Sequence, residues 1–267
     1  MTTDGLADLV ATAPAYAGTV APCFAFGVHK AGSSLMHSML QAVCVRSRLP
    51  FTNVPGALFD RGVFEKDWEA NPTLIPLFSA GAVHLGFRVF PQLLLDAEVR
   101  LAERRSVLLL RDPRDALVSA FFSYGGQLTH VLPKHAPEKF LQRFEEKRQV
   151  DIDAYCLGNA KGLLQKLDTY RRVLSAPNNR EFRYETVFFD KRAFLEGVFE
   201  HFGISIDPSI IQEVAEKHDV RPVTEDRTKH IRKGYPGDHR EKLKPETIER
   251  LNEIFRPHQD LLEEPHA

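Results

Sequence analysis

Short apolar runs followed by helix-like segments recur along the chain. Residues 23–28 (CFAFGV) and 106–110 (SVLLL) are nearly continuous apolar runs, as expected for parallel strands buried on both faces. Residues 82–90 and 181–188 give two further strand candidates. The segment after residue 90 carries apolar residues at helical spacing. This alternation predicts an α/β fold, in which helices flank a central parallel sheet.

The second half of the chain is mainly helical in pattern. Residues 137–175 predict helical structure, and three shorter helices are expected further on. Their sequences are RAFLEGVFEHFG, closed by Gly203, PSIIQEVAEKH, opened by Pro208, and PETIERLNEIF. Residues 50–80 and 221–244 are richer in proline, glycine and polar side chains and are expected to be loops.

Length and composition indicate one folded domain. The chain has 267 residues, of which 43% are hydrophobic, enough for a substantial core. We expect a domain over residues 21–267, preceded by a flexible arm over residues 1–20, where small residues prevail. No internal repeat divides the sequence.

Charge and cysteine content narrow the class of protein. Basic and acidic residues number 35 and 36, so no overall field attracts nucleic acid or an anionic membrane. An anion site would have to be local. The cysteines are Cys23, Cys44 and Cys156, an odd number without paired spacing, which indicates a reducing compartment. The N-terminal stretch has no signal-peptide pattern and no run is long enough to span a bilayer, so we expect a cytoplasmic protein.

The first candidate motif is GVHKAGSS, residues 27–34, between the first strand and a helix. Unsatisfied backbone N–H groups and the helix dipole suit an anion at such a turn. A nucleoside-triphosphate P-loop places its lysine after the second glycine, where this chain has Ser33; Lys30 lies inside the loop instead. A strand-to-helix turn without a ligand is the alternative for this segment.

The second candidate motif is RDPRDALVS, which begins where the strand at residues 106–110 ends. Arg111 is expected at the carboxyl edge of the sheet, where α/β proteins bind ligands, and Ser119 lies eight residues later. Asp112 resembles the magnesium-binding carboxylate that follows a hydrophobic strand in P-loop ATPases, but the neighbouring arginines argue against a cation there. Independently of function, Asp112 and Pro113 fit the start of a helix.

The third candidate motif is HIRKGYPGDH, residues 230–239, in the expected C-terminal loop. Two adjacent cations followed by a glycine suit a phosphate monoester. A solvated basic loop is the alternative, and the motif by itself decides little.

Taken together, the three motifs resemble those of the sulfotransferases that use 3′-phosphoadenosine 5′-phosphosulfate (PAPS). Their order and spacing match that family from residue 24 to 238, most of the chain. The resemblance implies a single α/β domain with a P-loop-type sheet, PAPS as co-substrate and no metal. It places the 5′-phosphosulfate at the first loop, by Lys30, Ala31, Gly32, Ser33 and Ser34.

The same resemblance assigns the remaining donor-binding positions. It implies that Arg111, Ser119, Arg232, Lys233 and Gly234 bind the 3′-phosphate. Tyr184, followed by Glu185, resembles the family's tyrosine-glutamate pair and is expected near the nucleotide, with a half-buried strand tyrosine as the alternative. Lys30 would neutralise charge on the leaving oxygen.

Two departures from the family concern the adenine. Leu35 stands where cytosolic members have a tryptophan that stacks on adenine, so another aromatic residue must take that role. His239 stands where the family's third motif usually has a tryptophan.

The general base is the least determined position. Family members carry a histidine in a Lys-x-His-x-Pro segment, and aligning on Pro91 puts Val89 there. His84 and His130 are ranked equally as candidates, and His29 lies inside the first loop. Arg88 can steady charge on the transferring group but cannot serve as a base.

We therefore predict transfer of a sulfuryl group from PAPS to an acceptor hydroxyl, or less favourably an amine. The acceptor is expected to be a small molecule, lipid or carbohydrate, in a pocket formed by residues 50–80 and 122–150, whose phenylalanines slightly favour an apolar molecule. No nucleic-acid partner or membrane span is expected. The alternatives are a P-loop kinase for nucleotides or small molecules and a noncatalytic nucleotide-binding protein.

Overall fold

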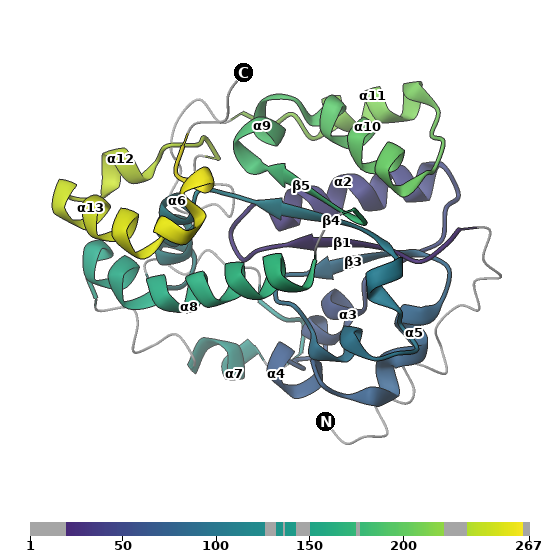
Figure 1. Cartoon of the computed structure of the whole chain (residues 1–267), viewed down its shortest axis with the longest axis horizontal. Helices are drawn as coiled ribbons and strands as arrows, with labels where there is room; N and C mark the ends of the chain where they lie inside the picture. Colours follow the sequence, from purple (N-terminus) through teal and green to yellow (C-terminus); the bar gives the residue numbers. More distant parts are fainter. Residues whose placement is uncertain are drawn as a thin grey trace.

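A five-stranded parallel sheet forms the centre of the molecule (Figure 1). The computed structural model describes residues 20–125, 132–135, 137–142, 150–174, 177–221 and 234–263. The strands lie in the order β2-β3-β1-β4-β5. Their bounds are β1 Cys23–Gly27, β2 Phe51–Thr52, β3 Val83–Phe87, β4 Arg105–Leu110 and β5 Asn179–Arg183. The sheet confirms the predicted fold class.

Helices cover both faces of the sheet, because the central strands are apolar on both sides. In β1, Phe24 and Phe26 pack into one hydrophobic cluster, whereas Cys23 and Ala25 pack into the other. The helices on the Cys23 side are α2 (Ser33–Arg46), α9 (Tyr184–Phe189), α10 (Lys191–Phe202) and α11 (Pro208–Lys217). The main helices on the Phe24 side are α3 (Val54–Asp60), α5 (Ile75–Ser79), α6 (Pro113–Ala120), α8 (Ile152–Val173) and α13 (Pro245–Ile254).

Shorter elements complete the described chain. They are α4 (Glu65–Trp68), α7 (Pro137–Gln142), α12 (His239–Lys242), the 3₁₀ turns η1 (Pro72–Leu74), η2 (Gln92–Leu95), η3 (Leu101–Glu103) and η6 (Arg256–Leu261), and the π-helical turn η4 (Phe121–Gly125). Among the described residues, none of the helices combines the length and the apolar character that a membrane crossing needs.

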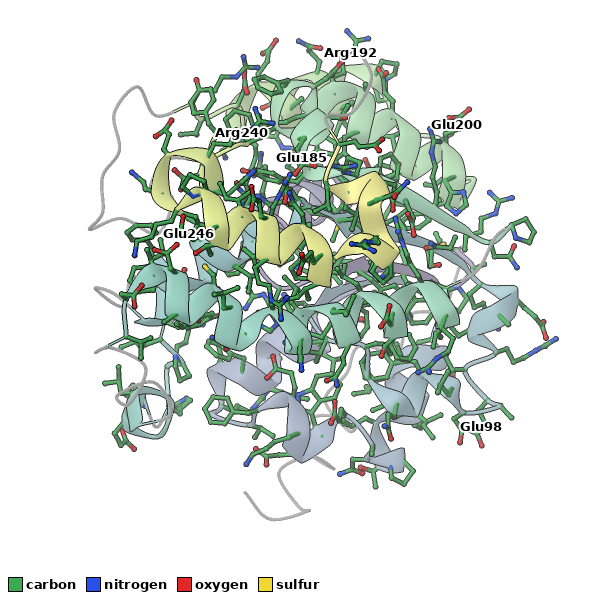
Figure 2. The ribbon with its side chains drawn as sticks, turned by 60° about the vertical axis from the view of Figure 1, so that its left-hand side comes forward. Glu98, Glu185, Arg192, Glu200, Arg240 and Glu246 are labelled. Atoms are coloured by element: carbon green, nitrogen blue, oxygen red, sulfur yellow. The ribbon has the colours of Figure 1, made fainter. Side chains whose placement is uncertain are left out.

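The predicted helix starts and ends are confirmed where proline and glycine marked them. Gly203 ends α10 with a φ of 70°, a conformation that suits glycine. Pro208 and Pro245 lie in the first turns of α11 and α13. In Figure 2, Arg192 and Glu200 project outward from α10, whereas Glu185 lies among the packed elements.

Two expectations about the first half of the chain are wrong. Residues 50–80 are not only loops: they contain β2 and several short helices, since Asn53 and Asn71 cap helices whose first turns hold the prolines. The segment after Pro91 forms two 3₁₀ turns rather than a helix. There the N–H of Leu93 donates to the carbonyl of Glu69 and Arg100 has a φ of 54°, which interrupts helical pairing.

Two predicted strands end earlier than expected. β3 stops at Phe87, which leaves Arg88 beyond the end of the strand. The run 181–188 is split, because β5 ends at Arg183 opposite the end of β4 and α9 begins at Tyr184. Tyr184, Val187 and Phe188 are buried at helical spacing.

Parts of the predicted segments lie outside the described residues. These are nearly all of the expected N-terminal arm, the interval 143–149 within the helical region 137–175, and residues 222–233 of the expected C-terminal loop. Within the same loop, the short helix α12 follows Asp238.

Candidate active site

The strand order brings the first and second motifs side by side. β1 pairs with β3 on one side and with β4 on the other. The chain after β1 runs to β2 on the β3 side, whereas the chain after β3 crosses to β4 on the opposite side, so the connections diverge at β1. A crevice forms at the carboxyl ends of strands at such a position, and α/β proteins bind ligands there. The loop after β1 carries Lys30, and the residue after β4 is Arg111.

The turn between β1 and α2 is tightly constrained. Gly32 has a φ of 85°, and a Cβ atom there would lie 2.4 Å from Cδ2 of Tyr184. Lys30 also has a positive φ, of 64°, which is uncommon for a residue with a side chain. The turn leads into the N-terminus of α2, a helix of 14 residues, whose first N–H groups and dipole favour an anion.

The Lys30 ammonium group lies close to two other cations. Its Nζ donates to Oγ of Ser123 at 2.7 Å. Burial, together with the positive charges of Arg88 and Arg111, lowers the pKa of Lys30 to about 7. A binding anion would relieve this repulsion and favour the charged lysine.

Arg111 is buried, 8% exposed, at the end of β4. One guanidinium nitrogen donates to the carbonyl oxygen of Lys30 at 3.3 Å, and another lies 3.5 Å from the carboxylate of Asp115. Its Nε has no hydrogen-bond partner among the described residues. A buried donor normally has a partner, so Arg111 retains capacity for an anionic ligand.

Asp112 acts as a helix cap. Its Oδ1 accepts from the backbone N–H of Arg114 at 2.9 Å, and the Arg114 guanidinium holds both carboxylate oxygens. Pro113 follows as the first residue of α6. The predicted N-cap is confirmed, and the carboxylate is already neutralised by an arginine.

Tyr184 connects all three motifs. Its ring lies against Gly32, the Arg111 guanidinium stacks on it at 4.4 Å from the ring centroid, and its hydroxyl donates to the carbonyl of Gly234 at 2.6 Å. Tyr184 is 6% exposed, and burial raises its pKa. It begins α9 rather than lying half-buried in a strand, and it lies beside the first loop.

Asp115 fixes the segment that follows Gly234. Its carboxylate accepts from the backbone N–H groups of Gly237 at 2.7 Å and His239 at 2.9 Å, and from Nδ1 of His239 at 2.7 Å. Burial raises the pKa of Asp115, but the His239 hydrogen bonds and Arg111 outweigh burial and hold it well below its usual range. His239 therefore has a structural role at the position where the family has a tryptophan.

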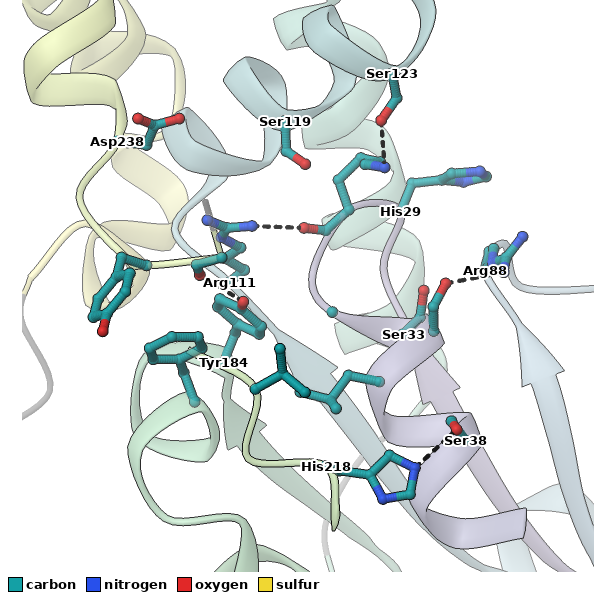
Figure 3. Close-up of a pocket in the computed structure, with 18 of the residues that line it drawn as sticks. His29, Ser33, Ser38, Arg88, Arg111, Ser119, Ser123, Tyr184, His218 and Asp238 are labelled. Atoms are coloured by element: carbon teal, nitrogen blue, oxygen red, sulfur yellow. Dashed lines mark hydrogen bonds between the residues drawn. The ribbon is translucent and has the colours of Figure 1, made fainter. Parts of the chain in front are cut away.

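These groups surround a cavity of about 390 Å³ (Figure 3). It brings together seven predicted residues that share no single element: Lys30, Gly32, Ser33, Ser34, Arg111, Ser119 and Tyr184, with Gly234 as an eighth. Ala31, within the same loop, is buried in the hydrophobic core and does not line the cavity. Arg232, Lys233 and His130 lie outside the described residues.

Several lining residues were not found from the sequence. Tyr235 packs on Phe188 with ring centroids 4.8 Å apart, and both face the cavity. An aromatic next to the RKG motif was the available signal for Tyr235. Lys217 and His218 come from the end of α11, which no motif marked. Ser123 lies one helical turn after Ser119 and was missed because its role depends on the position of Lys30.

The structure does not bring His84 to this cavity. His84 is the second residue of β3, fully buried, and stacks on Phe24 at a centroid distance of 4.8 Å. Its ring nitrogens are bonded to Thr52 and to the carbonyl of Ala80. Burial lowers its pKa to about 4. The expectation that His84 can reach the acceptor is corrected, because β3 continues past it to Phe87.

His29 and Arg88 do line the cavity. Arg88, just beyond β3, donates to Oγ of Ser34 at 3.2 Å. The carboxyl end of β3 therefore delivers a cation to the start of α2, next to the Lys30 loop.

Residues 23–263 match the family model of the sulfotransferase domain. No curated protein sequence matches the chain. Among solved structures, mouse sulfotransferase SULT7A1 complexed with PAP is similar at a TM-score of 0.61 and 16% identity, covering 89% of this chain and 83% of that one. Retinol dehydratase with androsterone and the inactive cofactor PAP is similar at 0.56 and 14%, covering 97% and 86%.

Proposed function

Because the chain belongs to the sulfotransferase family, we propose that it transfers a sulfuryl group from PAPS to an acceptor hydroxyl. The reaction releases adenosine 3′,5′-bisphosphate (PAP). The observation that carries the proposal is the set of contacts that Tyr184 makes with the Lys30 loop, Arg111 and Gly234 beside one cavity. The solved neighbours at TM-scores above 0.5 share the fold, and both contain PAP.

The donor is proposed to span the cavity with its two phosphate ends at different walls. The 5′-phosphosulfate lies at the N-terminus of α2, near Ser33 and Ser34, where backbone N–H groups favour an anion. The 3′-phosphate lies between Arg111, with its unpartnered Nε, and Ser119. Arg232 and Lys233 are assigned to the same phosphate by the family resemblance and remain predictions.

The adenine base of the donor is proposed to stack on the aromatic side chains that line the cavity. Tyr235 and Phe188 are packed together at the cavity and offer ring faces in place of the tryptophan that Leu35 replaces. Stacking of a base on an aromatic side chain contributes about 1–3 kcal/mol in nucleic-acid complexes. Tyr235 is held next to Gly234, so the base and the 3′-phosphate would be bound by neighbouring residues.

In the transfer step, the acceptor oxygen forms a bond to sulfur as the bond from sulfur to the bridging phosphate oxygen breaks. The electron pair of that bond leaves with the bisphosphate. Lys30 neutralises the charge that develops on the bridging oxygen, and Arg88 neutralises charge on the sulfuryl oxygens. The acceptor hydroxyl loses its proton to a base, for which His29 and His130 remain the predicted candidates; an amine acceptor is the less favoured option.

Calorimetry and a transfer assay test this function together. PAP is expected to bind the intact protein without magnesium, and labelled sulfate is expected to pass from PAPS to an acceptor. Absence of PAP binding by folded protein would refute the proposal. Tight PAP binding without transfer to any acceptor of a broad panel would favour the noncatalytic alternative. Magnesium-dependent ATP binding would favour the kinase, against which Ser33 and the arginine-held Asp112 argue.

A further inference from the structure

A second cavity, of about 870 Å³, opens beside the first one. The two share five lining residues, Ser34, Ser38, Arg88, Lys217 and His218. The hydrogen bond from Arg88 to Ser34 crosses their boundary, next to the loop that carries Lys30. An acceptor lying in the second cavity would therefore approach the start of α2, where the sulfuryl group is proposed to lie.

The sizes of the cavities favour separate occupants. Ligand sites commonly measure about 300–1,000 Å³, so the first cavity, at about 390 Å³, suits a single molecule. The donor nucleotide is the molecule proposed for it. The second cavity is more than twice as large, so it can take an acceptor that extends beyond one ring.

The walls of the second cavity combine polar and apolar groups, and their polar share is larger than in the first cavity. One face of α2 contributes Ser38 and Gln41, while the opposite wall contributes Asn53 and Glu65. Its aromatic side chains are Phe51 and Phe59. A sugar ring has hydroxyl groups at its edges and C–H groups on its faces, and this mixture of polar groups with two aromatic rings matches both.

Several charged groups of this cavity already have partners in the protein. Arg46 forms an ion pair with Glu213, and Asp60 forms one with Lys134. His218 is within 3.0 Å of the Ser38 hydroxyl. Such pairing weakens the attraction for an ionic acceptor. The other charged side chains of the lining, Glu65, Arg88 and Lys217, carry charges of both signs, which favours a neutral polar acceptor over one with a large net charge.

His37 adds an unused hydrogen-bonding group. Its ring lines the second cavity on α2 and is 6% exposed, and its Nε2 has no partner among the described residues. Burial lowers the pKa of His37 to about 3, so the ring is neutral. Buried polar atoms normally have partners, so this nitrogen is a hydrogen-bonding group that the described residues leave unsatisfied next to the cavity.

We propose that the second cavity is the acceptor site and that it takes a neutral, hydroxyl-rich acceptor of the saccharide class. This assignment rests on the proposed sulfotransferase function. It differs from the apolar acceptor that the phenylalanines of residues 50–80 slightly favoured: Phe64 and Phe78 are buried in the structure and do not line either cavity.

The test compares neutral oligosaccharides with apolar alcohols such as a steroid alcohol, using PAPS and labelled sulfate. Saccharides are expected to be sulfated with a kcat/KM about tenfold or more above that of the apolar alcohols. Preference for the apolar alcohols, or sulfation of neither class by protein that binds PAP, overturns the saccharide assignment and leaves the donor site standing. Failure to bind PAP overturns both proposals.

A substitution on α2 tests the location. Gln41 is exposed and lines only the second cavity. A tryptophan at this position would narrow that cavity. Gln41→Trp is expected to lower kcat/KM for the saccharide about tenfold while the PAP Kd stays within about twofold. Gln165→Trp is the matched control, because Gln165 is exposed on α8, away from both cavities. Equal saccharide turnover in both variants overturns the location.

Discussion

The carboxyl ends of β4 and β3 lie on either side of β1, yet they are built differently. Beyond β4, Arg111 is buried and fixed by Lys30, Asp115 and Tyr184. Beyond β3, Arg88 makes one described hydrogen bond, to Ser34. The β4 side carries the arginine and serine that the family resemblance predicts, Arg111 and Ser119, whereas Val89 stands on the β3 side where that resemblance expects a histidine. The many described contacts of the β4 side suit the proposed site of a single donor, and the fewer contacts of the β3 side suit an acceptor that can vary.

The largest effect should come from the residue that lies between these two sides. Lys30→Ala removes the cation proposed at the bridging oxygen, and turnover is expected to fall about 1,000-fold. Initial rates of sulfate transfer at saturating PAPS measure it, with thermal unfolding to show that the fold persists. Unchanged turnover would remove Lys30 from the mechanism.

The same lysine predicts a pH dependence. Since its pKa in the free protein is about 7, Lys30 loses its charge as pH rises through that value. PAP affinity should therefore fall above pH 7, and the fall should be absent in Lys30→Ala. Calorimetry at pH 6 and pH 8.5 distinguishes the two, and an equal fall in the variant would contradict the assignment.

On the donor side, Gly32→Ala should be the most damaging small change. The added Cβ would lie 2.4 Å from the Tyr184 ring, and the φ of 85° is unfavourable for alanine. PAP affinity is expected to fall about 30-fold, or about 2 kcal/mol. Gly158→Ala in α8 is the control, because nothing lies within 4 Å of its Cβ position; that change should stabilise the fold slightly.

A smaller effect is expected where α6 holds the C-terminal segment. Asp115→Asn weakens the hydrogen bonds to Gly237 and His239, and PAP affinity should fall about tenfold. The rate of sulfate transfer should fall by the same factor for every acceptor tested. If acceptor choice changed instead, the separation between the β4 and β3 sides would be wrong.

Asp115 also contributes to stability in a pH-dependent manner. Its folded pKa is lowered, so its contribution is complete above the unfolded pKa of about 4 and is lost as pH falls below it. Urea unfolding at pH 7 and pH 3.5 should show a smaller pH effect in Asp115→Asn than in the parent protein. Equal pH effects would contradict the assigned ion pairing.

The smallest effect is predicted for Ser123→Ala. The serine positions Lys30 through one hydrogen bond of 2.7 Å, and turnover is expected to fall about threefold to tenfold with little change in PAP affinity. Steady-state kinetics separates kcat from binding. An effect as large as that of Lys30→Ala would show that Ser123 itself takes part in the reaction.

The sequence predicted the β4 side better than the β3 side for physical reasons. Apolar runs, a proline at N1 and a glycine C-cap are local signals. The strands next to Lys30 and Arg111 and the bounds of α10 and α11 could therefore be predicted from the sequence. The contacts of Tyr184 depend on pairing between segments that are distant in the sequence. The change from β5 to α9 occurs where the pairing with β4 ends.

The errors have the same origin. The proline-rich residues 50–80 fold into short helices because asparagine caps and first-turn prolines act together. His84 was a candidate only while the end of β3 was unknown. Ser123 and His37 belong to no motif, and Tyr235 lies in the third motif without a role that the motif itself indicates. The roles of all three follow from neighbours that are distant in the sequence.

The central claim is that one cavity holds both phosphate groups of an adenosine donor. Calorimetry with PAP and with adenosine 5′-phosphate, which lacks the 3′-phosphate, tests it most directly. Without magnesium, PAP is expected to bind about 100-fold more tightly than adenosine 5′-phosphate, and Arg111→Ala should remove most of that difference. Equal affinity for the two nucleotides in the parent protein would contradict the account.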